Sequence, residues 1–128
     1  MVRTIWRFDY DQESGVPDNR QLFFDTRAVP GRPDGAAMDA DGCYWMAGVS
    51  GWQLYRLTPD GQLDMTIDMP VEKPTKPMFG GPDLDILYVT SIGANLTAGT
   101  EERQPDAGGL FAVTGLGIKG INQPRFTG

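Results

Sequence analysis

The chain has 128 residues and a formal net charge of −6, a size that suits one modest domain. The acidic balance argues against nucleic acid or an anionic membrane as the main partner, because either would need a basic face. It is compatible with cation binding, although an excess of acidic residues also serves ordinary solubility.

The N-terminal part of the sequence predicts a hairpin. Residues 4–10 alternate apolar and polar side chains, the period of a half-buried strand. Residues 11–19 are rich in turn-forming types, and residues 20–24 have the composition of a second strand. We therefore expect two paired strands over this part of the chain.

The middle of the sequence predicts one complete sheet. Residues 31–35, Gly-Arg-Pro-Asp-Gly, are expected to form a sharp loop. Four short strands are expected after it, at 35–38, 43–48, 53–57 and 63–68, with turns at 39–42, 50–51 and 59–61. Short strands joined by tight turns are typical of a meander sheet.

The same pattern begins again further along the chain. Residues 75–80, 86–91 and 109–113 predict three more strands, and 93–108 a long polar loop. Trp45 and Tyr88 occupy matching places in the two units, roughly 40 residues apart, which is the period of propeller blades. The internal similarity is weak, so periodicity alone leaves the architecture open. No segment shows a sustained helical stripe.

The absence of histidine restricts the chemistry. No Ser-His-Asp triad, Cys-His pair or histidine-bound zinc site can be built from this sequence. The single cysteine, Cys43, excludes an intrachain disulfide and lies in an apolar strand pattern typical of a buried thiol. Hydrolytic chemistry would have to use carboxylates, a hard cation with oxygen ligands, or residues from elsewhere.

No leader and no membrane span are recognisable. The chain does not open on a basic and then apolar segment, and no run approaches the ~20 apolar residues that a spanning helix needs. We therefore expect a cytoplasmic location.

Six runs carry a family resemblance. They are RPDGAAMD (32–39), DGCYWMA (41–47), LYRLTPDG (54–61), FGGPDLDILYVTS (79–91), GGLFAV (108–113) and the closing PRF (124–126). Together they resemble the gluconolactonase/regucalcin-like, or senescence marker protein, family of six-bladed β-propellers. The long run at 79–91, at this distance from RPDG, is the most specific of them.

The resemblance implies an all-β fold that is only part of a propeller. The match is to the C-terminal part of the family, about two and a half to three four-stranded antiparallel blades. It implies a partial blade at 1–30, a complete blade at 31–72, and the last blade and tail at 73–128. Met1 is then expected to be an internal residue of a longer protein. A half-propeller that pairs with another chain is the alternative.

The resemblance also implies a role for Asp34. In the family one divalent ion sits in the central channel, held by oxygen ligands from several blades, and only the Asp of the Pro-Asp-Gly motif maps onto this chain. Asp34 is therefore expected to be a metal ligand, for calcium, zinc, manganese or magnesium, and a candidate catalytic base. The ion would polarise a lactone carbonyl. From the residues alone, turn capping is the commoner role of such an acid.

The remaining candidates are expected to be structural. Asp41 and Asp60 are predicted turn acids. Asp83 and Asp85 are predicted turn acids too, with a paired calcium site as the alternative. Residues 101–103, Glu-Glu-Arg, are predicted to form a solvated loop tip. Four aromatic residues are candidates for lining a substrate mouth: Trp6, Trp45, Trp52 and Tyr88. For Trp45 and Tyr88, which lie on predicted blade strands, packing between blades is the favoured role.

Three functions follow from these expectations. The first is divalent-metal-dependent hydrolysis of a sugar lactone, with this chain holding part of the site and inactive alone. The second is a non-catalytic calcium-binding or interaction module of the same fold. The third is an inert product that self-associates through exposed blade edges.

Overall fold

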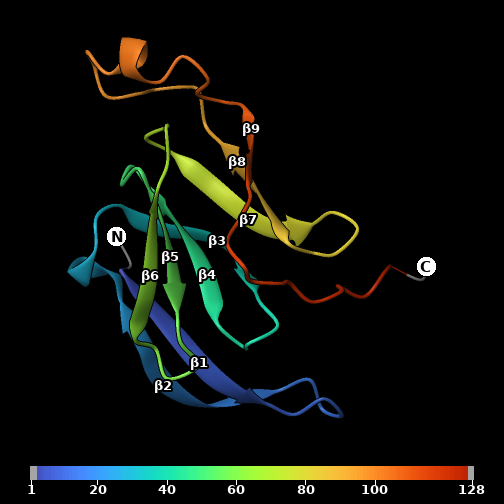
Figure 1. Ribbon diagram of the computed structural model, residues 1–128. Helices are drawn as coiled ribbons and strands as arrows, with labels where there is room; N and C mark the ends of the chain where they lie inside the picture. Colours follow the sequence, from blue (N-terminus) through green and yellow to red (C-terminus); the bar gives the residue numbers. More distant parts are fainter. Residues whose placement is uncertain (1–2, 127–128) are drawn as a thin grey trace.

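The computed structural model describes residues 3–126, and nearly all of its regular structure is β-strand. The strands form three antiparallel sheets, ordered β1-β2, β3-β4-β5-β6 and β7-β8-β9 (Figure 1). Their bounds are Thr4–Tyr10 (β1), Pro17–Asp25 (β2), Arg32–Met38 (β3), Tyr44–Val49 (β4), Gln53–Leu57 (β5), Leu63–Asp68 (β6), Pro74–Gly80 (β7), Ile86–Ser91 (β8) and Leu110–Val113 (β9). The expected all-β class is confirmed.

Among residues 3–126 the helical structure is limited to single turns. Two 3-10 turns lie at Thr26–Ala28 (η1) and Glu101–Arg103 (η2). None of the helices between residues 3 and 126 is long and apolar enough to cross a membrane.

The strand predictions hold except around residues 31–35, where the predicted loop is wrong. Strand β3 already begins at Arg32, and its register pairs Pro33 with Gly48 and Ala36 with Met46. Two residues, Asp34 and Gly35, therefore face one residue of β4, which is a bulge inside the strand and not a loop. Strand β2 also begins earlier than expected, at Pro17, so that the hairpin connection is shorter.

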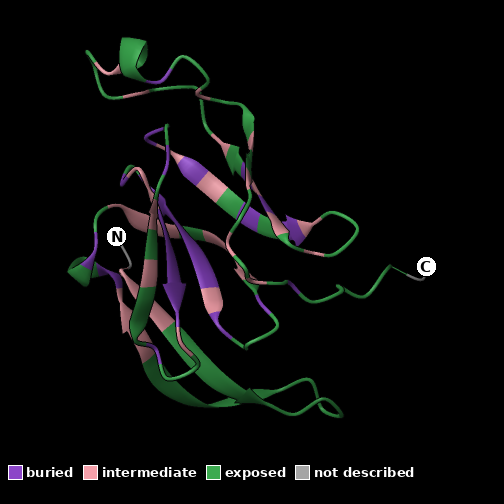
Figure 2. Cartoon of the chain, viewed as in Figure 1, coloured by how far each residue is buried: buried purple, intermediate pink, exposed green. Residues whose placement is uncertain are grey.

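The main hydrophobic core lies between the second and third sheets. Trp45 and Leu54 of the central sheet and Leu87 and Val89 of the C-terminal sheet are fully buried in one cluster. The rings of Trp45 and Phe79 meet edge to face, with centroids 5.8 Å apart. Figure 2 shows the buried residues gathered in β4 and β5 and on the strands facing them, whereas most of the β1–β2 hairpin is exposed. Packing between sheets is thus confirmed as the role of Trp45.

The first hairpin packs more loosely against the central sheet. Between them lies a groove of about 240 Å³ with mainly apolar walls, and its lining includes Ile5, Trp6, Phe23, Met38, Tyr44 and Pro59. The contact is therefore partial, and aromatic side chains of β1 remain partly exposed.

Strands β3 and β7 approach each other closely at Gly35. A Cβ atom on Gly35 would lie 2.7 Å from the carbonyl oxygen of Thr75 and 2.6 Å from Cδ of Lys76. The ammonium group of Lys76 crosses the same gap and donates to the carbonyl of Ala36. A glycine at this place lets two neighbouring sheets meet backbone to backbone.

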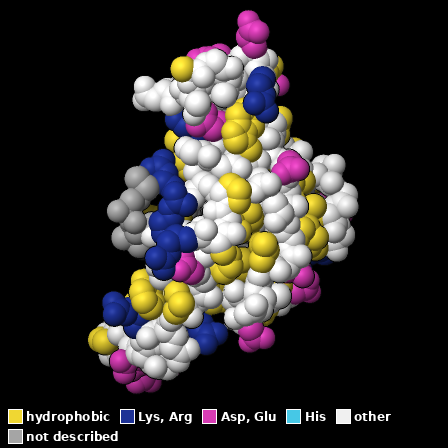
Figure 3. All heavy atoms as spheres, turned by 90° about the vertical axis from the view of Figure 1, so that its left-hand side faces the viewer, with side chains coloured by type: hydrophobic (Ala, Val, Ile, Leu, Met, Phe, Trp, Pro, Cys, Tyr) yellow, Lys and Arg dark blue, Asp and Glu magenta, His cyan; other side chains and the backbone are white. Residues whose placement is uncertain are grey.

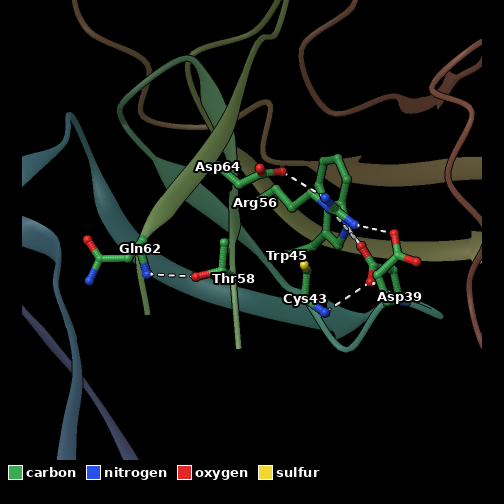
Figure 4. Close-up of polar contacts among 8 residues, drawn as sticks. Asp39, Cys43, Trp45, Arg56, Thr58, Gln62 and Asp64 are labelled. Atoms are coloured by element: carbon green, nitrogen blue, oxygen red, sulfur yellow. Dashed lines mark hydrogen bonds and ion pairs between the residues drawn. The ribbon is translucent and has the colours of Figure 1, made fainter. Parts of the chain in front are cut away.

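A buried carboxylate, that of Asp39, joins the strands at the end of the central sheet where β3 ends. Asp39 is 2% exposed, and its Oδ1 accepts from the backbone N–H groups of Asp41 and Cys43, both at 3.0 Å. Its Oδ2 accepts from Nε1 of Trp45 and Nε of Arg56, both at 2.8 Å (Figure 4). All four contacts converge on one side chain, which had been expected only to mark a turn.

Arg56 extends this cluster to the edge of the sheet. Its guanidinium pairs with Asp39, with Asp41 through Nη2 at 2.7 Å, and with Asp64 through Nη1 at 2.7 Å. Strands β5 and β6 and the β3–β4 turn are thereby joined by one planar cation. Asp41, predicted to be a turn acid, does lie in that turn and has this second role.

Replacing Gly35 by alanine should weaken the contact between the two sheets. The added methyl group would collide with the backbone of β7, which cannot rotate away as a side chain would. We expect the free energy of unfolding to fall by about 1–3 kcal/mol, measured by urea denaturation. An unchanged free energy of unfolding would show that β3 and β7 are not held this close.

The acidic partners of Arg56 should differ in how much they contribute to the free energy of unfolding. Asp39→Asn should lower the free energy of unfolding by about 3 kcal/mol, because it breaks an ion pair that is buried. Asp41→Asn, whose side chain is 70% exposed, is the matched control and should cost less than about 1 kcal/mol. Equal losses in the two variants would contradict the central place of Asp39.

The same cluster predicts a pH dependence. Burial alone would raise the pKa of Asp39, but hydrogen bonds from Arg56, Trp45 and Cys43 hold that pKa below its usual value. Its stabilisation is therefore present above an unfolded pKa of about 4 and is lost as the pH falls through the lowered folded pKa. We expect denaturation curves from pH 7 to pH 2 to show a smaller acid destabilisation in Asp39→Asn than in the unaltered chain.

Candidate functional site

Several loops meet at the end of the sheets where β3 begins. The start of β3 lies opposite the end of β4, since Arg32 pairs with Val49, and the start of β7 lies opposite the end of β8, since Pro74 pairs with Ser91. The β4–β5 turn, the β6–β7 link and the long loop after β8 are therefore at the same end as Asp34. The Asp39 turn and the β5–β6 and β7–β8 turns lie at the opposite end.

Asp34 is exposed and occupies the bulge near the start of β3. Within residues 3–126 its carboxylate makes no hydrogen bond and no ion pair, so it caps no turn there. The backbone on either side of Asp34 is restricted, because Pro33 has a fixed φ and Gly35 is in close contact with β7. The carboxylate oxygens are consequently available to a ligand.

The second Pro-Asp-Gly tripeptide has a different setting. Asp60 lies in the turn between β5 and β6, at the other end of the sheet, as the turn prediction required. This turn is closed by hydrogen bonds between Thr58 and Gln62, including Gln62 N–H to Oγ1 of Thr58 at 3.1 Å (Figure 4). The two tripeptides have the same sequence, but the first lies within strand β3 and the second in a turn.

The ligand set for a metal ion is incomplete in this part of the chain. Between residues 3 and 126 no three His, Cys, Asp or Glu side chains are arranged so that together they could hold a metal ion. A carboxylate such as Asp34 suits a hard divalent ion in donor type, but such ions require about six oxygen ligands, waters included. Asp83 and Asp85 are exposed in the β7–β8 turn, where no third acid joins them.

The long loop after β8 is anchored to the β6–β7 link by a buried carboxylate. Glu72 is 4% exposed, and its carboxylate accepts from the backbone N–H and from Oγ1 of Thr97, both at 2.9 Å. Oε1 of Gln104, which is 2% exposed, accepts from the backbone N–H of Glu72 at 2.8 Å. The N–H of Thr97 lowers the pKa of Glu72, although burial opposes this effect. The loop is therefore anchored at two points.

The anchored loop places a cation over an aromatic ring. The guanidinium carbon of Arg103 lies 5.3 Å from the centroid of the Trp52 ring. Trp52 lies in the β4–β5 turn and has a φ of +61°, an uncommon conformation for a bulky residue. The predicted loop tip at 101–103 is indeed exposed, but the side chain of Arg103 stacks on the ring of Trp52.

The four aromatic candidates are separated by the structure. Trp45 is in the core, Trp6 lies on the far side of the central sheet beside Arg20, and Tyr88 packs over Gly80. Only Trp52 lies at the Asp34 end. The sequence contained no sign of its stacking with Arg103 or of the anchor at Glu72, because neither follows a local pattern.

The model of the family described as "SMP-30/Gluconolactonase/LRE-like region" matches residues 1–93. Regucalcin of Xenopus laevis is 38% identical over 121 residues, which cover 94% of this chain and 40% of that protein. The 6-deoxy-6-sulfogluconolactonase of Pseudomonas putida is 42% identical over 125 residues, covering 97% of this chain and 42% of that protein.

Solved structures show the same relationship. A regucalcin from Agrobacterium tumefaciens, described as a calcium-binding protein, superimposes with a TM-score of 0.85 at 30% identity over 96% of this chain and 42% of that one. A luciferin-regenerating enzyme gives a TM-score of 0.83 at 35% identity over 93% of this chain and 40% of its own.

The chain spans about two fifths of the length of the curated relatives it matches. Its three sheets correspond to part of a β-propeller, as expected from the resemblance in the sequence. With a family model matching residues 1–93 and similar folds in the solved relatives, the chain belongs to the SMP-30/gluconolactonase/LRE-like family.

Proposed function

We propose that this chain contributes one carboxylate, that of Asp34, to a site for divalent-metal-dependent hydrolysis of a sugar lactone. The observation that carries the proposal is the setting of Asp34, which is exposed and unpaired among residues 3–126 near the start of β3. Membership of a family with gluconolactonase members supports the reaction class. Calcium, zinc, manganese and magnesium all accept carboxylate oxygen.

The rest of the site lies outside the described residues in this proposal. One carboxylate cannot hold a catalytic ion, and no group of three metal-ligating side chains within residues 3–126 could complete the ligand set. No catalytic step is therefore assigned to the residues of this chain alone. The chain by itself should bind metal weakly and turn over little or no lactone.

Manganese provides a sensitive test of the weak site. Added Mn²⁺ should broaden the amide NMR signals of Gly35 and Ala36, because a paramagnetic ion acts on nuclei close to it. Asp34→Ala should abolish this broadening. Asp60→Ala removes the acid of the other Pro-Asp-Gly tripeptide and is the matched control, which should leave the effect intact. Broadening that survives in Asp34→Ala, or that centres on Asp83 and Asp85, would contradict the proposal.

Lactone ring opening by the chain alone is the complementary measurement. Glucono-δ-lactone hydrolysis should stay at the spontaneous rate with added calcium, manganese, zinc or magnesium. Robust metal-dependent turnover by monomeric chain would show that the site is complete within these 128 residues, contrary to the proposal.

A non-catalytic calcium module is the second candidate, favoured by the description of one similar structure as a calcium-binding protein. It requires that this chain alone bind calcium tightly and be stabilised by it. Calorimetric titration of the unaltered chain and of Asp34→Ala separates the two. Micromolar affinity for calcium in either protein would favour the module, whereas a single-carboxylate site predicts millimolar or weaker binding.

A further inference from the structure

We propose that Trp52 and Arg103 form a binding site for the anionic end of a sugar substrate, at the same end of the sheets as Asp34. The inference deepens the proposed lactone hydrolysis and rests on it for the identity of the substrate as a lactone. It assigns the ligand class, an acidic sugar, to two residues that carry no part of the metal site.

The indole ring is held in a fixed position. The backbone N–H of Trp52 donates to the carbonyl of Glu72 at 3.2 Å, and its carbonyl accepts from the N–H of Met69 at 2.7 Å. These two bonds hold the residue at its positive φ, where a bulky side chain is seldom found unless its surroundings impose it. The indole N–H donates to no group between residues 3 and 126, and it is not a buried unsatisfied atom, so it remains open to a ligand.

The guanidinium of Arg103 is also unoccupied. Among the described residues it makes neither a hydrogen bond nor an ion pair, although Glu101 and Glu102 share its turn. Arg27 and Arg56, by contrast, are already paired with carboxylates. The stacking on Trp52 restricts the Arg103 side chain and leaves its N–H groups available.

The position of the pair relative to Asp34 suits a single small ligand. A Cβ on Gly31 would lie 2.9 Å from Cα of Gly51, so the start of β3 touches the turn that carries Trp52. Asp34 follows Gly31 by three residues, at most about 11 Å along an extended chain. Figure 3 shows a run of Lys and Arg side chains down one side of the face that lies to the left in Figure 1, so the net acidic charge does not cover this face uniformly.

The chemistry of the pair selects the ligand. An indole face packs against the apolar face of a sugar ring, and a guanidinium binds the oxygens of a sulfonate, sulfate, phosphate or carboxylate through paired N–H groups. A sugar lactone with a terminal anion would place that anion on Arg103 while its ring packs against the part of the Trp52 indole that Arg103 leaves uncovered. The lactone carbonyl would then be directed toward Asp34.

The test follows the indole signals of the whole chain in ¹H–¹⁵N NMR spectra. Glucose 6-sulfate and glucose 6-phosphate are the charged probes. Glucose is the control without a charge, and inorganic sulfate is the control without a sugar. We expect both charged sugars to shift the Trp52 signal, with apparent affinities about tenfold higher than those of glucose or sulfate alone. The Trp45 signal, whose N–H is held by Asp39 in the core, should not move and reports that the fold is intact.

Two arginine variants make the test specific. Arg103→Gln should weaken the response of Trp52 to the charged sugars by about tenfold. Arg20 lies over the ring of Trp6 at 4.7 Å, a matched pair at another place, and Arg20→Gln should leave the response unchanged. A Trp52 signal that does not move, that responds equally to glucose, or that is indifferent to Arg103→Gln would overturn the proposal.

The result is independent of the metal site. Asp34→Ala should leave the Trp52 response intact, because the readout needs neither metal nor turnover. A failed metal site with an intact Trp52 response would count against lactone hydrolysis only. A lost Trp52 response with manganese still bound at Asp34 would count against the anion site only.

Discussion

The carboxylate of Asp39 is the contact on which the central sheet depends. It binds the β3–β4 turn through two backbone N–H groups, β4 through the indole of Trp45, and β5 through Arg56. Trp45 in turn packs against Phe79 of the next sheet. Beside Asp39, the N–H of Ala40 donates to the carbonyl of Lys119, which ties the C-terminal tail to the same turn. One buried acid thus fixes the β3–β4 turn within the central sheet, and Trp45 and the tail connect this turn to the C-terminal sheet.

The two ends of the sheets have different physical characters. At the Asp39 end Arg56 pairs with Asp39, Asp41 and Asp64, and the tail contacts the β3–β4 turn at Ala40. At the Asp34 end an unpaired carboxylate, an unpaired guanidinium and an open indole lie on or beside loops, among residues 3–126. Rigid strands that present reactive groups from one end are a common arrangement of binding sites. Gly35 joins the central and C-terminal sheets near the Asp34 end, because it lets β3 and β7 pack closely just beyond Asp34.

Much of the fold could be predicted because alternation and turn residues are local signals. The strands from β4 to β8 fall within a residue or so of their expected bounds, and Asp60 lies in its expected turn. The bulge at Asp34 could not be predicted, since it depends on how β3 is paired with β4. The pair of Asp39 and Arg56 spans 17 residues, and the stacking of Arg103 on Trp52 joins two loops far apart in the sequence. Such contacts exist only once the sheets are assembled.

The central claim is that Asp34 is one ligand of a lactonase site that other blades complete. A chimera tests it most directly: this chain replaces the matching two fifths of the Pseudomonas putida relative, with which it shares 42% identity. The account predicts a folded chimera that opens a sugar lactone only with an added divalent ion, and an Asp34→Ala chimera that folds equally well but loses at least about a hundredfold in rate. A folded chimera whose metal-dependent rate is the same with and without Asp34 would contradict the account.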